Sequence, residues 1–273
     1  LSVSSAASDV YKRQPEGNTI AAAEHALALL LSLSRHVPQA HGSMRAGAWD
    51  RKKYVGNELY KKVLGVVGLG KIGSHVTKVA KAMGMNVIAF DPFVSAERAQ
   101  QMQVRLTTLE DLFRQADYIT LHIPRTPDTE NLVNAELLRT MKPTARIVNC
   151  ARGGIVDEAA IAEAIETGVI AGAGLDVFAS EPLAQDSPLR GVERGLVLTP
   201  HLGASTEEAQ ENVAIDVAEQ IRDVLLGLPA RSAVNIPGLS AEIMERLKPH
   251  LQLAETLGPV SYTHLTLPTT LTV

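Results

Sequence analysis

The sequence predicts an α/β fold, namely a Rossmann-type doubly wound parallel sheet with helices on both faces. Short apolar runs rich in β-branched residues alternate with longer segments of helical periodicity, which is the pattern of parallel strands joined by crossover helices. The clearest run, residues 63–67 (VLGVV), leads into a glycine-rich turn and a helix. Ligands of such sheets bind beyond the carboxyl ends of the strands, so polar residues that follow the strands are the first candidates for function.

The glycine-rich turn has the spacing of a dinucleotide-binding motif, G-x-G-x-x-G, at Gly68, Gly70 and Gly73. Gly68 permits the tight turn, Gly70 lets a pyrophosphate approach the backbone, and Gly73 lets the helix at 72–83 pack closely on the strand. The N-terminus of that helix offers N–H groups and a partial positive charge to phosphates. Because such a turn alone is a weak signal, the residues that follow it decide the interpretation.

An acidic residue, Asp91, closes the second expected strand at 87–90. It lies at about the distance from the glycines at which a carboxylate binds the ribose hydroxyls of NAD. No arginine follows in 92–94 to accept a 2′-phosphate, and the carboxylate would repel one. Strand, glycines, helix, second strand and acid thus occur in order, so we predict an NAD site that prefers NAD to NADP.

The first helix is expected at 20–34, and because it is apolar on nearly all faces we expect it to lie buried between two bodies of protein. We interpret His25, His36 and His41 as packing or surface residues rather than ligands. The other expected elements are a helix at 38–49, a short helix at 95–102, a strand near Val104, a helix opened by Thr108, a strand at 118–123, a helix capped by Asn134, a strand at 145–150, a helix capped by Asp157, strands at 171–177 and 196–199, and an amphipathic helix from a cap at Ser205 to about Leu226.

Composition and charge exclude several classes of protein. The chain has 26 Lys and Arg against 30 Asp and Glu, so neither nucleic acid nor an anionic membrane is an expected partner. Cys150 is the single cysteine, which excludes an internal disulfide, and no Cys/His cluster has the spacing of a metal site. The longest apolar run, 26–33, is too short to span a bilayer. We expect a cytoplasmic protein, or an organelle-stroma protein if a targeting peptide has been lost.

The two ends carry sequences that a single stretch of DNA would encode. DVYKRQ at 9–14 corresponds to one strand of a short DNA, and VSYTHL at 260–265 corresponds to its reverse complement read in another frame. Chance is a poor explanation for that match. We therefore interpret 1–14 and 260–273 as adapter-derived, non-native segments and exclude them from the fold.

Three charged residues follow the expected strands. Arg152, in NCARGG, lies beside two glycines that let backbone and ligand come close, and an arginine binds a carboxylate bidentately. Glu181 precedes a proline in a turn, and His201 follows a proline at the end of a short strand. Taken singly, each would more often be a solvated or structural residue. Because all three would lie at one edge of the sheet, beside the predicted NAD site, we interpret them together as catalytic.

The ordered set of motifs VVGLGKIG, LHIP, NCARGGIVDE, GLDVFASEP and PHLGAST resembles that of the D-isomer-specific 2-hydroxyacid dehydrogenases, and the resemblance covers nearly all of 15–258. Three further segments, RKKYVGNEL, HLGASTEEAQ and AVNIPGLSAEIMERLKPHLQLAETLG, are most similar to the branch of that family that oxidises D-3-phosphoglycerate in serine biosynthesis. The function implied is transfer of a hydride from a 2-hydroxy acid to NAD.

The resemblance implies a role for each candidate. Arg152 would bind the substrate carboxylate, His201 would be the acid/base, and Glu181 would pair with His201. The cofactor-binding residues that it implies are Gly68, Gly70, Lys71, Ile72, Gly73, Asp91, Ile123, Cys150, Ala151, Asp176, Gly203 and Ala204, with no metal ligands. The substrate would be a small 2-hydroxy acid, and the assembly a homodimer or tetramer formed largely by the helix at 18–36 and the basic loop at Arg51.

A domain organisation is implied as well: 15–204 as the NAD-binding domain with N-terminal interdomain helices, 205–235 as a helix and segment returning to the substrate domain, and 236–259 as the start of a further domain. We expect the N-terminal half of the substrate domain and a terminal regulatory domain to be missing, and hence weak NAD binding and negligible dehydrogenase activity from this chain alone. Two alternatives stay open. One is another dehydrogenase of the family, such as a glyoxylate or hydroxypyruvate reductase, and the other is a non-enzymatic NAD-sensing corepressor on the same fold.

Overall fold

The computed structural model describes residues 17–226 together with 246–247, 249–250, 253 and 257. The segments 1–14 and 260–273, interpreted as non-native, lie outside the described residues, as does most of 236–259. Of the described residues, 17–212 belong to one compact unit, and those from Val213 onward belong to a second. The sheet and every predicted site residue lie in the first unit.

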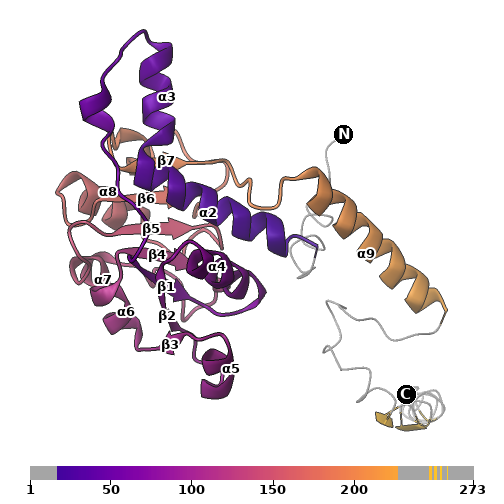
Figure 1. The fold of residues 1–273 in the computed structure, drawn as a ribbon. Helices are drawn as coiled ribbons and strands as arrows, with labels where there is room; N and C mark the ends of the chain where they lie inside the picture. Colours follow the sequence, from indigo (N-terminus) through magenta and orange to yellow (C-terminus); the bar gives the residue numbers. More distant parts are fainter. Residues whose placement is uncertain (1–16, 227–245, 248, 251–252, 254–256, 258–273) are drawn as a thin grey trace, which may run out of the picture. The chain divides into compact units, whose positions relative to one another are not determined.

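The first unit is built on a parallel sheet in the strand order β3-β2-β1-β4-β5-β6-β7 (Figure 1). The strands are β1 Val63–Val67, β2 Asn86–Phe90, β3 Arg105–Leu106, β4 Tyr118–Leu121, β5 Arg146–Asn149, β6 Gly172–Leu175 and β7 Leu196–Leu198. Neighbouring strands end in register, through the pairs Val67–Phe90, Val67–Leu121, Leu121–Asn149, Asn149–Leu175 and Leu175–Leu198. The order reverses between β1 and β4, so the ligand crevice of such a sheet is expected at the carboxyl edge there. The prediction of a doubly wound sheet is confirmed.

The helices are α2 Thr19–Arg35, α3 Val37–Arg45, α4 Lys71–Ala82, α5 Ala96–Gln101, α6 Leu109–Gln115, α7 Ala135–Arg139, α8 Glu158–Glu166 and α9 Glu207–Leu225, with 3-10 turns η1 Arg51–Tyr54 and η2 Pro188–Gly191. The helices of the first unit cover both faces of the sheet. Phe113 of α6 joins Ile147 of β5 in one core cluster, whereas Leu30 of α2 joins Val148, the next residue of β5, in the other. Successive strand residues point to opposite faces, so burial of both explains why the strands read as continuous apolar runs.

Helix α2 packs on α4 and on β5, β6 and β7. Its buried stripe includes Ala26, Leu29 and Leu33, while Ile20 and Leu31 on the outer side are 50% and 40% exposed. The predicted burial is therefore observed on one side only. At the end of α2 the chain turns at His36, whose φ of 53° is left-handed.

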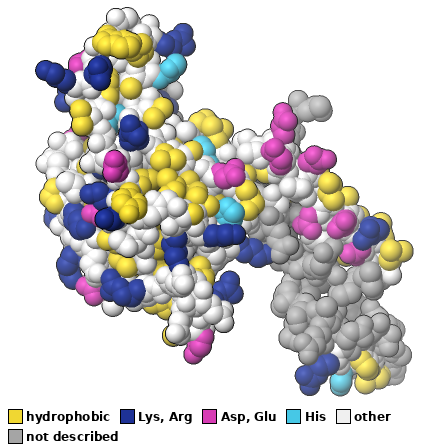
Figure 2. Space-filling view, in the orientation of Figure 1, with side chains coloured by type: hydrophobic (Ala, Val, Ile, Leu, Met, Phe, Trp, Pro, Cys, Tyr) yellow, Lys and Arg dark blue, Asp and Glu magenta, His cyan; other side chains and the backbone are white. Residues whose placement is uncertain are grey.

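Helix α3 is shorter than predicted, because it ends at Arg45 and the chain then turns at Gly47, which has a φ of +85°. Apolar side chains gather at this end of the unit in Figure 2, and Met44, Trp49 and Val55 are among the exposed ones. The homo-oligomer expected at this end of the molecule stays a prediction.

Helix α9 begins one residue later than predicted. The Thr206 hydroxyl accepts the Ala209 N–H at 3.0 Å, which makes Thr206 the cap. Ser205 is instead part of the preceding turn, where its N–H donates to the Leu202 carbonyl at 2.8 Å. Among the described helices, none is both long enough and apolar enough to cross a membrane.

Candidate active site

The glycine turn between β1 and α4 has the backbone geometry that its motif predicts. Gly68 has a φ of +95°, and a Cβ there would lie 2.6 Å from the carbonyl oxygen of His122. A Cβ on Gly73 would overlap the carbonyl oxygen of Gly68, so α4 packs directly on the turn. In contrast, a Cβ on Gly70 would meet nothing within 4 Å. The turn is thus closed toward the protein at two glycines and open at the third, beside the N-terminus of α4 at Lys71 and Ile72, where a phosphate would bind.

Asp91 lies against this turn. Its Oδ2 accepts the Leu69 N–H at 2.7 Å and its Oδ1 accepts the Phe93 N–H at 2.9 Å. The hydrogen bonds fix the carboxylate at the end of β2, within the same crevice as Gly70. Open space over Gly70 and a fixed acid beside it fit a dinucleotide with its pyrophosphate on α4 and its ribose at Asp91.

The loop after β5 is braced by its own asparagine. The Asn149 side chain accepts the Ala151 N–H at 3.0 Å and donates to the Arg152 carbonyl at 3.0 Å. A Cβ on Gly153 would overlap the Phe178 carbonyl oxygen, so the backbone of this loop is in close contact with the loop after β6. The Arg152 side chain is exposed and its Nη1 donates to the Ala151 carbonyl at 2.6 Å. The guanidinium therefore lies at the carboxyl edge of the sheet but is hydrogen-bonded to its own loop.

Two titratable residues at this edge are held neutral by burial. Burial lowers the pKa of His122, just after β4, to about 4. Burial also raises the pKa of the Cys150 thiol, just after β5, and the nearby Asp176 carboxylate raises it further. At neutral pH neither His122 nor Cys150 therefore adds a charge to this edge.

Glu181 and His201 are joined by a hydrogen bond. The His201 Nδ1 lies 2.7 Å from Glu181 Oε2, and the side chains are 39% and 37% exposed. Glu181 Oε1 accepts the Phe178 N–H at 3.1 Å, which orients the carboxylate. Because Nδ1 faces a carboxylate and carries the proton, the lone pair of His201 Nε2 is left to act as a base. A cavity of about 470 Å³ borders the pair and is lined also by Phe178, Pro182, Leu183, Arg190, Leu198, Thr199 and Pro200.

The turn that carries His201 is bound to Asp176, the fully buried residue that follows β6. Asp176 Oδ1 accepts the Leu202 N–H at 2.8 Å, Oδ2 accepts the Gly203 N–H at 2.8 Å, and the Asp176 carbonyl accepts the His201 N–H at 2.8 Å. Burial by itself would raise the pKa of the Asp176 carboxyl, but its hydrogen bonds outweigh burial and lower the pKa below its ordinary value. Asp176 is therefore an ionised anchor for the turn.

Comparison with known proteins identifies the family. Residues 27–203 match the family model described as D-isomer specific 2-hydroxyacid dehydrogenase, NAD binding domain. The chain belongs to the D-isomer-specific 2-hydroxyacid dehydrogenase family. It is 66% identical over 249 residues to the D-3-phosphoglycerate dehydrogenase of Synechocystis sp., a match that covers 91% of this chain and 45% of that protein. It is 49% identical to the D-3-phosphoglycerate dehydrogenase of Bacillus subtilis, over 89% of this chain and 46% of that protein.

A solved structure of the same family has a similar fold. The D-lactate dehydrogenase of Aquifex aeolicus, complexed with NAD and lactic acid, matches with a TM-score of 0.70 and 28% identity, covering 78% of this chain and 68% of that one. The resemblance seen in the sequence motifs is thus confirmed, as is an NAD-binding domain. The chain spans about 45% of the length of the D-3-phosphoglycerate dehydrogenases that it matches.

Most residues predicted for the dehydrogenase site come together at the carboxyl edge. Glu181 and His201 touch, Asp176 holds the turn at Gly203, and Ala204 continues that turn. Arg152 shares the edge, and only its Nη1 is used by the Ala151 carbonyl, which leaves other N–H groups for a substrate carboxylate. The roles of these residues in catalysis stay predictions.

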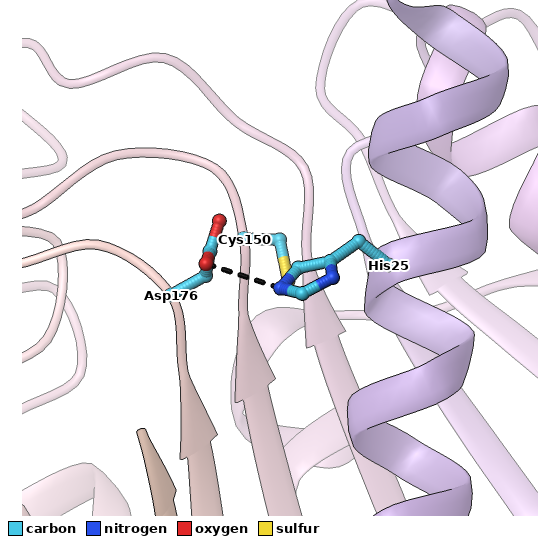
Figure 3. Close-up of side chains that lie close together, drawn as sticks. All are labelled: His25, Cys150 and Asp176. Carbon is cyan, nitrogen blue, oxygen red and sulfur yellow. Dashed lines mark hydrogen bonds and ion pairs between the residues drawn. The ribbon is translucent and has the colours of Figure 1, made fainter. Parts of the chain in front are cut away.

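One residue of the site escaped the sequence analysis. His25 of α2, interpreted from the sequence as a packing or surface residue, lies with its Nε2 3.1 Å from Asp176 Oδ1 (Figure 3). The same nitrogen lies 3.0 Å from Thr199 Oγ1. It shares the helical stripe of Ala22 and Leu29, both buried. A polar residue on an apolar stripe needs a buried partner. The position of His25 on an apolar stripe could therefore have indicated a buried partner, although it does not identify that partner.

Proposed function

We propose that the full-length protein containing this chain oxidises D-3-phosphoglycerate to 3-phosphohydroxypyruvate with NAD, as a cytoplasmic or plastid-stroma homodimer or tetramer in serine biosynthesis. The observation that carries the proposal is the hydrogen bond between His201 Nδ1 and Glu181 Oε2, 2.7 Å long, at the carboxyl edge of an NAD-binding sheet. The two relatives named above, with their high identity over nearly all of this chain, support the choice of substrate.

His201 supplies the proton transfer. Its Nε2 takes the proton of the C2 hydroxyl as that carbon becomes a carbonyl, and returns it in the reverse direction. The Glu181 carboxylate stabilises the imidazolium that forms and keeps the ring in the tautomer that presents Nε2 to the substrate. Phe178 orients Glu181 through its N–H, so the pair is set before substrate binds.

Arg152 positions the substrate. Its guanidinium binds the carboxylate of the 2-hydroxy acid bidentately, while the bond from Nη1 to the Ala151 carbonyl orients the group. Gly70 and Asp91 would hold NAD, which would supply the acceptor for the hydride of C2. A fixed carboxylate and a fixed base leave one hydrogen of the substrate facing the crevice, which is the arrangement that hydride transfer needs.

The test compares substrates on the full-length protein. Turnover of 3-phosphohydroxypyruvate and of glyoxylate with NADH is measured, and a higher kcat/KM for the phosphorylated substrate is expected. A preference for glyoxylate would identify a different 2-hydroxyacid dehydrogenase. NAD binding without turnover of either would favour a non-enzymatic NAD sensor.

The pairing of the two residues is tested separately with Glu181→Gln, which keeps a hydrogen-bond acceptor but removes the charge. Without the carboxylate the imidazolium that forms during oxidation is less stable. The acid limb of the kcat/KM profile for oxidation should therefore move to lower pH, whereas Glu193→Gln, at an exposed site, should leave it in place. An unmoved limb in Glu181→Gln would count against the pairing.

A further inference from the structure

We propose that His25 is a positioning residue for catalysis, which ties helix α2 to the turn that carries His201. It acts through Asp176 and Thr199 and does not itself touch the reacting atoms. The inference rests on the proposed function, because it takes His201 as the acid/base. It assigns a task to α2 beyond its packing on the sheet.

The hydrogen bonds of His25 have one consistent direction. The Thr199 hydroxyl donates to Asp176 Oδ1 at 2.6 Å, so its proton is used and its oxygen is left as an acceptor. Asp176 is ionised and can only accept. His25 Nε2 lies 3.1 Å from Asp176 Oδ1 and 3.0 Å from Thr199 Oγ1, so Nε2 must carry the proton that it shares between them. His25 thus joins α2 to the residues that follow β6 and β7.

The other side of Asp176 holds the catalytic turn. Its carboxylate oxygens accept the N–H groups of Leu202 and Gly203, the two residues after His201. His201 itself has a left-handed φ of 55°. A residue other than glycine keeps that conformation only where its surroundings hold it. The anchor that holds it is Asp176, and His25 is the donor to that anchor from α2.

A second contact joins the same helix to the same turn. A Cβ on Gly203 would lie 3.2 Å from Asp176 Oδ2 and 4.0 Å from the Cα of Ala22. Ala22 and His25 are three residues apart and lie on one face of α2. The turn therefore lies close to α2 at Ala22 and is linked to it at His25 through Asp176, so a shift of α2 would displace the imidazole of His201.

The cluster could also be taken for a metal site, because the donor atoms of His25, Cys150 and Asp176 lie within 4.8 Å of one another (Figure 3). Two features favour the hydrogen-bonded link. The Asp176 oxygens already accept hydrogen bonds from Thr199, Leu202, Gly203 and His25. Burial raises the pKa of the Cys150 thiol, and a zinc ligand must be a thiolate.

The experiment uses the full-length protein with His25→Leu, which removes the donor, and His25→Gln, whose amide N–H replaces it. His41→Leu, at an exposed residue of α3, is the matched control. We expect His25→Leu to lower kcat about 10–100-fold with KM little changed, because a slight misplacement of the base affects chemistry more than binding. His25→Gln should recover most of kcat, and His41→Leu should match the wild type. Amide exchange at Leu202 and Gly203 should rise in His25→Leu alone.

A second background separates positioning from general damage. If His25 acts only through His201, His25→Leu should lower kcat in the wild type but not further in His201→Asn. An equal loss in both backgrounds, or unchanged amide exchange at Leu202 and Gly203, would overturn the proposal. So would stoichiometric Zn²⁺ binding that Cys150→Ser abolishes. If His201→Asn itself kept full turnover, the proposed function would fail, which is a separate result from either outcome at His25.

Discussion

The two ends of the crevice are built in different ways. At the nucleotide end, β1, the glycine turn, α4 and Asp91 lie close in sequence, and the hydrogen bond from Leu69 to Asp91 spans 22 residues. At the catalytic end, the bonds from His25 reach across 151 residues to Asp176 and 174 to Thr199. The first region is a local motif and the second is assembled by the tertiary fold.

The two regions also depend on different physics. The nucleotide end is shaped by backbone, since Gly68 and Gly73 leave no room for a side chain and Gly70 leaves space for a ligand. The catalytic end is shaped by side-chain hydrogen bonds around Asp176. Substitutions should therefore act on folding or cofactor affinity in the first region and on turnover in the second.

The largest effect is expected at the catalytic end. His201→Asn keeps a polar side chain of similar size but removes the base, so turnover of the full-length protein should fall roughly 10²–10⁴-fold. NAD affinity, measured by calorimetry, should change little because the nucleotide end is intact. A comparable loss of NAD affinity would show that the two ends are not separable.

At the nucleotide end, two glycine substitutions should separate an effect on stability from an effect on NAD binding. Gly73→Ala forces a methyl group against the Gly68 carbonyl oxygen, which is backbone and cannot move aside, so the free energy of unfolding should fall by roughly 3 kcal/mol. Gly70→Ala meets open space and should unfold like the wild type in urea, yet bind NAD more weakly because its methyl group faces the phosphates. Equal stability of the two variants would contradict the observed packing of α4 on the turn.

The choice of cofactor should follow the charge at Asp91. A 2′-phosphate would lie against that carboxylate, so wild-type protein should bind NAD in preference to NADP. Asp91→Ser keeps a polar group but removes the charge, and should improve NADP affinity roughly 10-fold, about 1–2 kcal/mol at a partly exposed site. Dissociation constants for both cofactors provide the measurement, with Asp91→Asn as the size-matched uncharged variant. An unchanged ratio would mean that the ribose lies elsewhere.

The contrast between the regions explains what could be predicted from the sequence. Strand β1 has the bounds that were predicted, and α4 starts within a residue of its prediction, because glycine spacing and apolar runs are local signals. Helix caps are local too, and Thr108, Asn134 and Asp157 cap their helices as expected. The cap of α9 was misplaced by one residue because Ser205 and Thr206 are both good caps, and the Leu202 carbonyl, bound to Ser205, decides between them.

Tertiary partners were harder to predict. The strand ends placed Glu181, His201 and Asp176 at one edge of a parallel sheet, but periodicity carries no information on which side chains touch there. His25 was missed for that reason: nothing near it in sequence indicates Asp176 or Thr199. The resemblance to a family implied roles for Arg152 and His201. The hydrogen bonds of His25 on α2 became apparent only in the three-dimensional structure.

The smallest effect concerns His122, which lies between the two regions, with its carbonyl oxygen against Gly68 and its ring 2.9 Å from the Thr120 hydroxyl. Burial lowers the pKa of His122 from 6.5 to about 4. As pH falls below 6.5 the unfolded chain takes up a proton that the folded chain refuses, so stability is lost progressively down to about pH 4. At pH 5 the loss is at most about 2 kcal/mol, since solvent at the partly buried ring screens the effect.

Unfolding free energies in urea at pH 7 and pH 5 should show a smaller loss for His122→Gln, which cannot titrate, than for wild type. His41→Gln, at an exposed site, should follow the wild type. If both variants lose the same free energy of unfolding between pH 7 and pH 5, His122 is not the group that makes stability depend on pH.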